Sequence, residues 1–149
     1  MLSTNNIIKE NTKKEMYHFL TDQSAENTKL PTEQLEMAVI RFVQQLGIRP
    51  NLIGYHFLIK AILMTFNSPN LLKSLTKELY PKIAKDYGKN TKAVERNMRR
   101  AIESAYECDP QRIQSVFYYK VDKPYVSEVI SMAVETIRYD FKLNDHNSI

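Results

Sequence analysis

Residues 80–102 read YPKIAKDYGKNTKAVERNMRRAI, and this stretch decides the fold. Its spacing is that of a helix-turn-helix. Ala84 is small where the first helix must approach the second closely, Gly88 permits a positive φ in the turn, and Val94 faces back into the angle between the helices. A plain helical hairpin would share this spacing and stays open as an alternative.

The second helix of the motif, expected over residues 91–106 or 107 with Thr91 as its cap, has two contrasting faces. At about 100° per residue, one face gathers an apolar stripe. The opposite face carries four cations against one or two acids, whereas a solvated helix face usually mixes the two signs. This excess of positive charge favours contact with DNA over a face that is only solvated. The stripe consists of Val94, Met98, Ala101, Ile102 and Ala105, and the opposite face of Lys92, Arg96, Arg99, Arg100, Glu103 and, at its edge, Glu95.

The position of each side chain along this helix suggests its role. Arginine near the start of a recognition helix can donate paired hydrogen bonds to O6 and N7 of guanine, which makes Arg96 the candidate base reader. Glu95 could accept from a cytosine amino group, hold Arg96 in position, or simply face solvent. Arg99 and Arg100 lie later, where the groove falls away, and are expected to contact phosphates. The candidate DNA-binding residues of the motif are Lys85, Lys89, Thr91, Lys92, Glu95, Arg96, Arg99 and Arg100.

Helical patterning extends far beyond the motif. The chain has 149 residues with only 3 glycines and 6 prolines, so local preference leans towards helix throughout. The sequence therefore predicts an all-α fold, a bundle of six to seven helices that contains the helix-turn-helix. Gly47 is expected to end the first of them in a left-handed conformation. Outside the motif, the expected helices cover residues 32–46, 51 or 54 to 66, 71–79, 110–117 and 127–141.

The chain divides into three parts. Residues 1–31 form a polar N-terminal arm, which is either a frayed extension or a short helix. Residues 32–143 form one helix-turn-helix DNA-binding domain, since this length suits a single hydrophobic core. Residues 144–149 are expected to be a flexible tail.

Composition narrows the class of protein. The formal charge of +4 suits an acidic partner such as nucleic acid. The chain has no apolar run of membrane-spanning length and no leader pattern, which predicts a cytoplasmic, nucleoid-associated protein without a membrane partner. The three histidines have no partners at catalytic spacing, and Cys108 is the single cysteine. We therefore expect no enzyme activity, cofactor or metal, and a passive thiol.

Several short segments resemble one known family. They are Gly54-Tyr55, Ser74 to Lys77, Leu79 to Lys85, Val94 to Arg96 and Arg99 to Glu103. They resemble the DNA-binding effector domain of the sporulation initiation response regulator, the stage-zero transcription factor of endospore-forming bacteria, over about residues 35–141. The resemblance implies a six-helix bundle that binds short DNA boxes, often as tandem copies in contact through the C-terminal helix. It also implies base-region contacts for Glu95 and Arg96, a recognition-helix role for Arg99, and a DNA-backbone contact for Lys123.

The sequence also departs from that family. Ala93 stands where a basic residue is common, Arg100 where a histidine is common, and Val126 where an asparagine is common, so the preferred box could differ. The family's regulator carries a receiver domain with a phosphorylated aspartate, and that domain is built on a doubly wound sheet. The 30 polar residues at the start of this sequence cannot encode such a sheet. The sequence thus predicts a regulator that receiver phosphorylation does not control.

Two functions remain open. The first is a sequence-specific regulator that binds double-stranded DNA, as a homodimer or a tandem assembly. The second is a protein-interaction module that modulates or competes with a full-length sporulation regulator, using the apolar face of the last helix. Retention of Glu95, Arg96 and Arg99 favours DNA. The apolar face in question consists of Val129, Ile130, Met132, Ala133, Ile137 and Phe141, and Phe117-Tyr118-Tyr119 is kept as a candidate contact surface.

Overall fold

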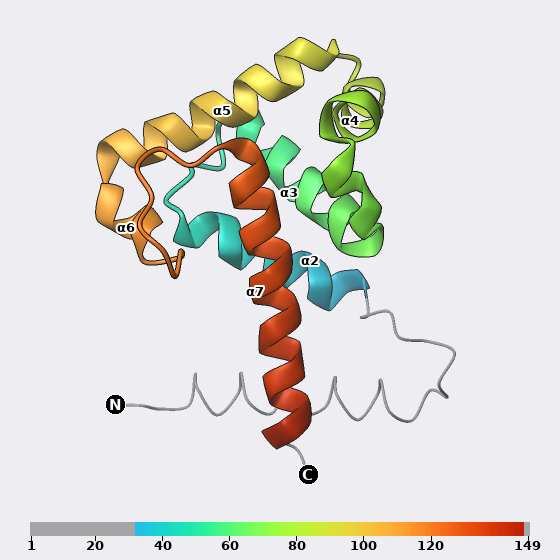
Figure 1. Cartoon of the computed structure of the whole chain (residues 1–149). Coiled ribbons are helices and arrows are strands. Elements are labelled where there is room, and N and C mark those ends of the chain that lie inside the picture. The colour runs from blue at the N-terminus through green and yellow to red at the C-terminus, as the bar shows by residue number, and fades with distance from the viewer. Residues whose placement is uncertain (1–31, 148–149) are drawn as a thin grey trace.

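Every regular secondary-structure element in the described part of the chain is a helix. The computed structural model describes the backbone of residues 32–147 and the side chains of residues 32–142 (Figure 1). The expected N-terminal arm, residues 1–31, lies outside the described residues. The all-α prediction with its helix-turn-helix is confirmed. Within residues 32–147 the elements are α2 (Thr32–Gln45), α3 (Ile53–Asn67), η1 (Pro69–Lys73), η2 (Leu75–Leu79), α4 (Tyr80–Tyr87), α5 (Thr91–Cys108), α6 (Pro110–Gln114) and α7 (Val126–Asn147).

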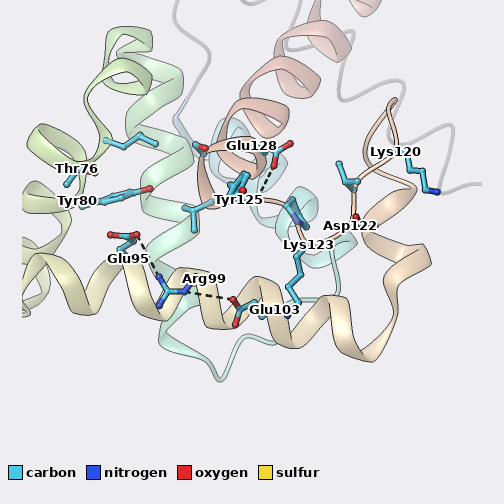
Figure 2. Close-up of a pocket in the computed structure, with 15 residues that line it drawn as sticks. Thr76, Tyr80, Glu95, Arg99, Glu103, Lys120, Asp122, Lys123, Tyr125 and Glu128 are labelled. Atoms are coloured by element: carbon cyan, nitrogen blue, oxygen red, sulfur yellow. Dashed lines mark hydrogen bonds and ion pairs between the residues drawn. The ribbon is translucent and has the colours of Figure 1, made fainter.

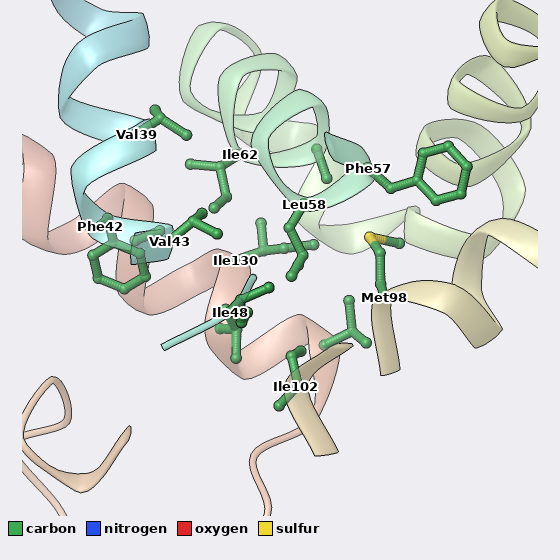
Figure 3. Close-up of a cluster of buried hydrophobic side chains, with 14 of the residues drawn as sticks. Val39, Phe42, Val43, Ile48, Phe57, Leu58, Ile62, Met98, Ile102 and Ile130 are labelled. Atoms are coloured by element: carbon green, nitrogen blue, oxygen red, sulfur yellow. The ribbon is translucent and has the colours of Figure 1, made fainter. Parts of the chain in front are cut away.

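A single hydrophobic core lies where α2, α3, α5 and α7 meet (Figure 3). Helix α3 is its centre and contacts the other three. Phe57, Leu58 and Ile62 on α3 are fully buried, and each such side chain stabilises the fold by about 1.5–3 kcal/mol relative to exposure. Helix α3 is therefore the central helix of the bundle, and α5 packs directly on it.

The segment before α4 differs from the expected regular helix over residues 71–79. A 3₁₀ turn, η1, is followed by a π turn, η2, in which the Leu79 N–H donates to the Ser74 carbonyl oxygen at 3.2 Å. Proline has no N–H, and its ring crowds the carbonyl four residues earlier. The wider π turn accommodates Pro81 without a break, so the chain runs directly from η2 into α4.

Helix α7 is longer than expected. It continues to Asn147 rather than ending at Phe141, and it includes residues 144–147 of the expected tail. No glycine or proline occurs between residues 126 and 147, so nothing in the local sequence stops the helix. By contrast, α6 ends at Gln114, three residues earlier than expected.

The apolar face of α7 packs into the chain's own core. The interaction-module hypothesis needed this face to be available to a partner, and the structure contradicts that requirement. Five of its six residues are at most 4% exposed, and Phe141 is half-buried. They are Val129, Ile130, Met132, Ala133 and Ile137.

Arg112 on α6 closes the C-terminal end of α2. Its Nε donates to the Gln45 carbonyl oxygen at 3.0 Å, and its Nη2 donates to the Gln44 carbonyl oxygen at 2.9 Å. The last carbonyl groups of a helix have no partner within that helix. Gly47 follows with φ of +84°, which confirms the left-handed helix end, and a Cβ added there would lie 3.3 Å from the Arg112 Cδ.

Replacing Arg112 with alanine should lower the free energy of unfolding by about 1 kcal/mol, because two carbonyl oxygens lose a charged donor. Urea denaturation followed by circular dichroism measures the change. Arg41→Ala is the matched control, since Arg41 is an exposed arginine on α2 for which the described residues provide no ion pair. Equal stability of the two variants would contradict the anchoring role.

Candidate nucleic-acid interface

Helices α4 and α5 form the predicted helix-turn-helix. Gly88 ends α4 in the left-handed region, with φ of +64°, and the Lys89 N–H donates to the Ala84 carbonyl oxygen at 2.8 Å. Ala84 and Val94 are both buried where the two helices meet. The expectations for Gly88, Ala84 and Val94 are therefore confirmed.

The cap of α5 is Asn90 rather than the expected Thr91. Asn90 has extended backbone angles, and its Oδ1 accepts from the Ala93 N–H at 2.7 Å. Thr91 is instead the first helical residue. Asparagine is among the strongest N-cap residues, so it takes the cap one position earlier and satisfies a free N–H of the first turn.

Asn90→Ala should therefore cost about 1 kcal/mol of folding free energy. It should also weaken DNA binding, because the first turn of α5 carries Lys92 and leads into Arg96. Thermal unfolding and a DNA titration measure the two effects. Asn90→Asp, in which a carboxylate oxygen replaces the amide oxygen as the acceptor, should retain stability. Equal losses in both variants would show that the cap does not act through this hydrogen bond.

A close contact between α3 and α5 fixes the position of the recognition helix. The five residues of the predicted stripe on α5 are all buried, as expected. Beneath them, a Cβ added at Gly54 of α3 would overlap the Asn97 carbonyl oxygen and lie 2.8 Å from the Ala101 Cβ. Only glycine allows this approach. The sequence reasoning missed this contact, although an isolated glycine in an apolar helical stretch is a signal of close packing.

The exposed face of α5 is basic, as predicted. Lys92, Arg96 and Arg100 are exposed, and no ion pair within the described residues involves them. Arg99 differs, because its Nη1 lies 3.8 Å from Glu95 Oε1 and its Nε lies 3.9 Å from Glu103 Oε1. Glu95 therefore holds Arg99, and the option in which it positions Arg96 is wrong.

An open hollow of ≈ 750 Å³ lies beside this face (Figure 2). It is bounded by η2, by Tyr80 at the start of α4, by α5 and by residues 120–128, which include the start of α7. Lys123 extends from that segment towards α5, where its Nζ lies 3.9 Å from Glu107 Oε1. The fold thus brings Lys123 to the same hollow as Glu95 and Arg99, although Lys123 is distant from them in sequence. Lys85 lies on α4 and Lys89 in the turn, both exposed, and neither lines it.

The comparison with known families agrees with this geometry. The family described as "Sporulation initiation factor Spo0A C terminal" matches residues 39–137. The chain belongs to this family. The matched region spans the helix-turn-helix, the hollow and most of α7, and it confirms the resemblance inferred from short segments. The Spo0A C-terminal family consists of DNA-binding transcription-factor domains of sporulation, not of enzymes.

The segment before α7 adds features to this Spo0A C-terminal domain that the sequence reasoning missed. Glu128 in the first turn of α7 accepts from the Tyr125 N–H at 3.0 Å and from the Tyr119 hydroxyl at 3.1 Å. A glutamate three residues after a helix cap is a known signal for this arrangement. Tyr118 and Tyr125 are 78% and 75% exposed, whereas Phe117 is buried. Of the expected aromatic contact surface, Phe117-Tyr118-Tyr119, Tyr118 and the 39% exposed Tyr119 therefore reach solvent, whereas Tyr125 was not part of that prediction.

Tyr80, which lines the hollow, and Tyr119, which is hydrogen-bonded to Glu128 of the hollow, carry no charge near neutral pH. Burial raises the pKa of Tyr80 to about 12, and the nearby Glu95 carboxylate adds to this rise. Desolvation, followed by the hydrogen bond to Glu128, raises the pKa of Tyr119. The charge of the hollow therefore comes from its lysines, Arg99 and its carboxylates.

The described residues of this Spo0A C-terminal family member contain neither a metal-binding cluster nor a membrane-spanning helix. Among them, no group of three or more histidine, cysteine, aspartate or glutamate side chains is arranged to hold a metal ion. No helix in residues 32–147 has the length and apolar character needed to cross a bilayer.

Proposed function

We propose that this chain is a sequence-specific DNA-binding transcriptional regulator whose helix α5 lies in the major groove of double-stranded DNA. One observation carries the proposal. Lys92, Arg96 and Arg100 form an exposed basic face on α5, opposite its buried stripe, with no carboxylate of the described residues in an ion pair with them. The major groove admits an α-helix, and cations on it can reach both base edges and phosphates.

The proposed roles follow from position. Arg96, early in α5 and exposed, reads a base edge, and Glu95 beside it accepts from a cytosine amino group. Arg99 and Arg100 contact phosphates, and Lys123 contacts the backbone from the other side of the hollow. The other proposed backbone contacts are Lys85, Lys89, Thr91 and Lys92.

Binding in this proposal does not depend on receiver phosphorylation, since the basic face of α5 is already exposed. Tandem copies on DNA would meet through the exposed side of α7, where Tyr139 is accessible. A regulator of this kind acts at the nucleoid. The apolar face of α7 is buried, so pairing with a full-length regulator through it has no support in the structure and is not proposed.

The test is a titration of the protein onto a labelled duplex with tandem copies of the family's box and onto a scrambled duplex, over a salt series. Specific regulators typically prefer their site by about 10³-fold or more. Preferential binding to the box supports the proposal. Equal, strongly salt-dependent binding to both duplexes would reduce the interaction to phosphate attraction and overturn sequence specificity. Absence of binding to either would overturn the proposal as a whole.

A further inference from the structure

We propose that Glu103 is an internal counter-ion of the interface, which holds Arg99 and thereby limits binding to DNA of unrelated sequence. Glu103 is on the DNA-facing helix, yet its charge is the wrong one for contact with phosphates. The inference rests on the proposed function and adds to it a residue that sets the ratio of specific to non-specific binding.

Arg99 sits between two carboxylates on the same face of α5. Glu95 precedes it by four residues and Glu103 follows it by four, with nitrogen-to-oxygen distances of 3.8 and 3.9 Å (Figure 2). Residues at this spacing are neighbours on a helix surface. The Arg99 guanidinium thus has a carboxylate on each side of it along α5.

Of the three side chains, Glu103 is the least exposed. Its side chain is 37% exposed, compared with 46% for Glu95 and 51% for Arg99. A less exposed charge is less screened by salt, so its field persists at the wall of the hollow. Glu95, Arg99 and Glu103 all line the same hollow.

The same arrangement recurs one turn later. Glu107 lies 3.9 Å from Lys123, which the family resemblance assigns to the DNA backbone. Carboxylates of α5 therefore engage two cations of the proposed interface, Arg99 and Lys123, whereas Lys92, Arg96 and Arg100 have no such partner among the described residues. This difference separates the free cations of the interface from those that a carboxylate already engages.

These pairs are weak enough to open. Their distances of 3.8 and 3.9 Å exceed hydrogen-bonding range, and exposed ion pairs contribute little to stability. Non-specific binding comes almost entirely from cations that neutralise phosphates, so an Arg99 engaged by Glu103 removes one such contact. In a specific complex, α5 enters the groove and the phosphates come close enough to displace the carboxylate. Glu103 should therefore weaken non-specific binding more than specific binding.

The experiment compares Glu103→Gln with Glu36→Gln, both of which remove one negative charge. Glu36 is exposed on α2 and does not line the hollow. For Glu103→Gln we expect affinity for the scrambled duplex to rise by about 3- to 10-fold and the salt dependence to steepen by about one phosphate contact. Affinity for the box should rise less, so the specificity ratio falls. Glu36→Gln should change neither affinity by more than about 2-fold, because distant exposed charges are screened.

Arg99→Ala distinguishes a counter-ion from simple repulsion. If Glu103 acts through Arg99, Glu103→Gln should have no effect on scrambled-duplex affinity in the Arg99→Ala background. A full effect in that background would overturn the proposal.

Elution from heparin, a sulfated polyanion, separates failure of this inference from failure of the proposed function. Glu103→Gln should elute at higher salt than Glu36→Gln even if the wild type shows no preference for the box, in which case only the proposed function fails. Elution of both variants at the same salt concentration would overturn the counter-ion role whatever the duplex titrations show.

Discussion

Gly54→Ala is expected to destabilise the domain by about 3 kcal/mol or more, at or beyond the upper end of ordinary overpacking. The added Cβ would overlap the Asn97 carbonyl oxygen, which belongs to the backbone of α5 and cannot turn aside as a side chain can. Helix α5 would have to move away from α3 and from the core beneath it. Urea denaturation followed by circular dichroism measures the loss, and the same shift should weaken DNA binding of any protein that stays folded.

Gly88→Ala is the control that separates crowding from backbone strain. A Cβ at Gly88 would meet no atom within 4 Å, but its φ of +64° is unfavourable for alanine. This variant should lose only about 1–2 kcal/mol. If the two variants lost equal stability, the close approach of α3 and α5 would not be the reason why Gly54 is a glycine.

The helix-turn-helix could be predicted because its determinants are local. Gly88 ends α4 through its own backbone freedom, and the apolar stripe of α5 repeats at the period of one helix. The predicted position of the cap, Thr91, was wrong by one residue because Asn90 and Thr91 are adjacent and both can cap a helix. Asparagine is the stronger N-cap residue of the two, and this ranking alone would have identified Asn90.

The partner of Glu95 could also have been predicted from the sequence. Residues four apart share a helix face and adjacent residues do not, so Arg99 was the better candidate than Arg96. The pairing of Lys123 with Glu107 is different, since it depends on how an irregular segment returns to α5. No sequence periodicity predicts the path of this segment, so the pairing is found only in the structure.

The role of the α7 apolar face could not be deduced from its pattern. A helix that packs on its own core and a helix that packs on a partner bury the same kind of stripe. What decides between them is whether the other helices leave that face uncovered. Here α3 and α2 cover it, because α3 has an apolar surface wide enough to contact α2, α5 and α7 together.

Arg96→Ala should reduce affinity for the box by about 1–3 kcal/mol while changing affinity for a scrambled duplex much less. Arg96 is exposed in the second turn of α5, and no described carboxylate forms an ion pair with it, so its guanidinium is free to donate paired hydrogen bonds to a guanine. Losing those bonds affects only the sequence that supplies the acceptors. Titrations onto both duplexes at one salt concentration measure the difference.

Arg100→Ala provides the contrast, because it removes the same charge from the same exposed face one turn later. A phosphate contact carries no sequence information, so this variant should weaken binding to both duplexes alike and reduce the salt dependence by about one contact. If Arg96→Ala behaved in the same uniform way, Arg96 would be a phosphate contact. The base reader would then have to be sought elsewhere on the exposed face of α5, with Glu95 beside it as the first residue to test.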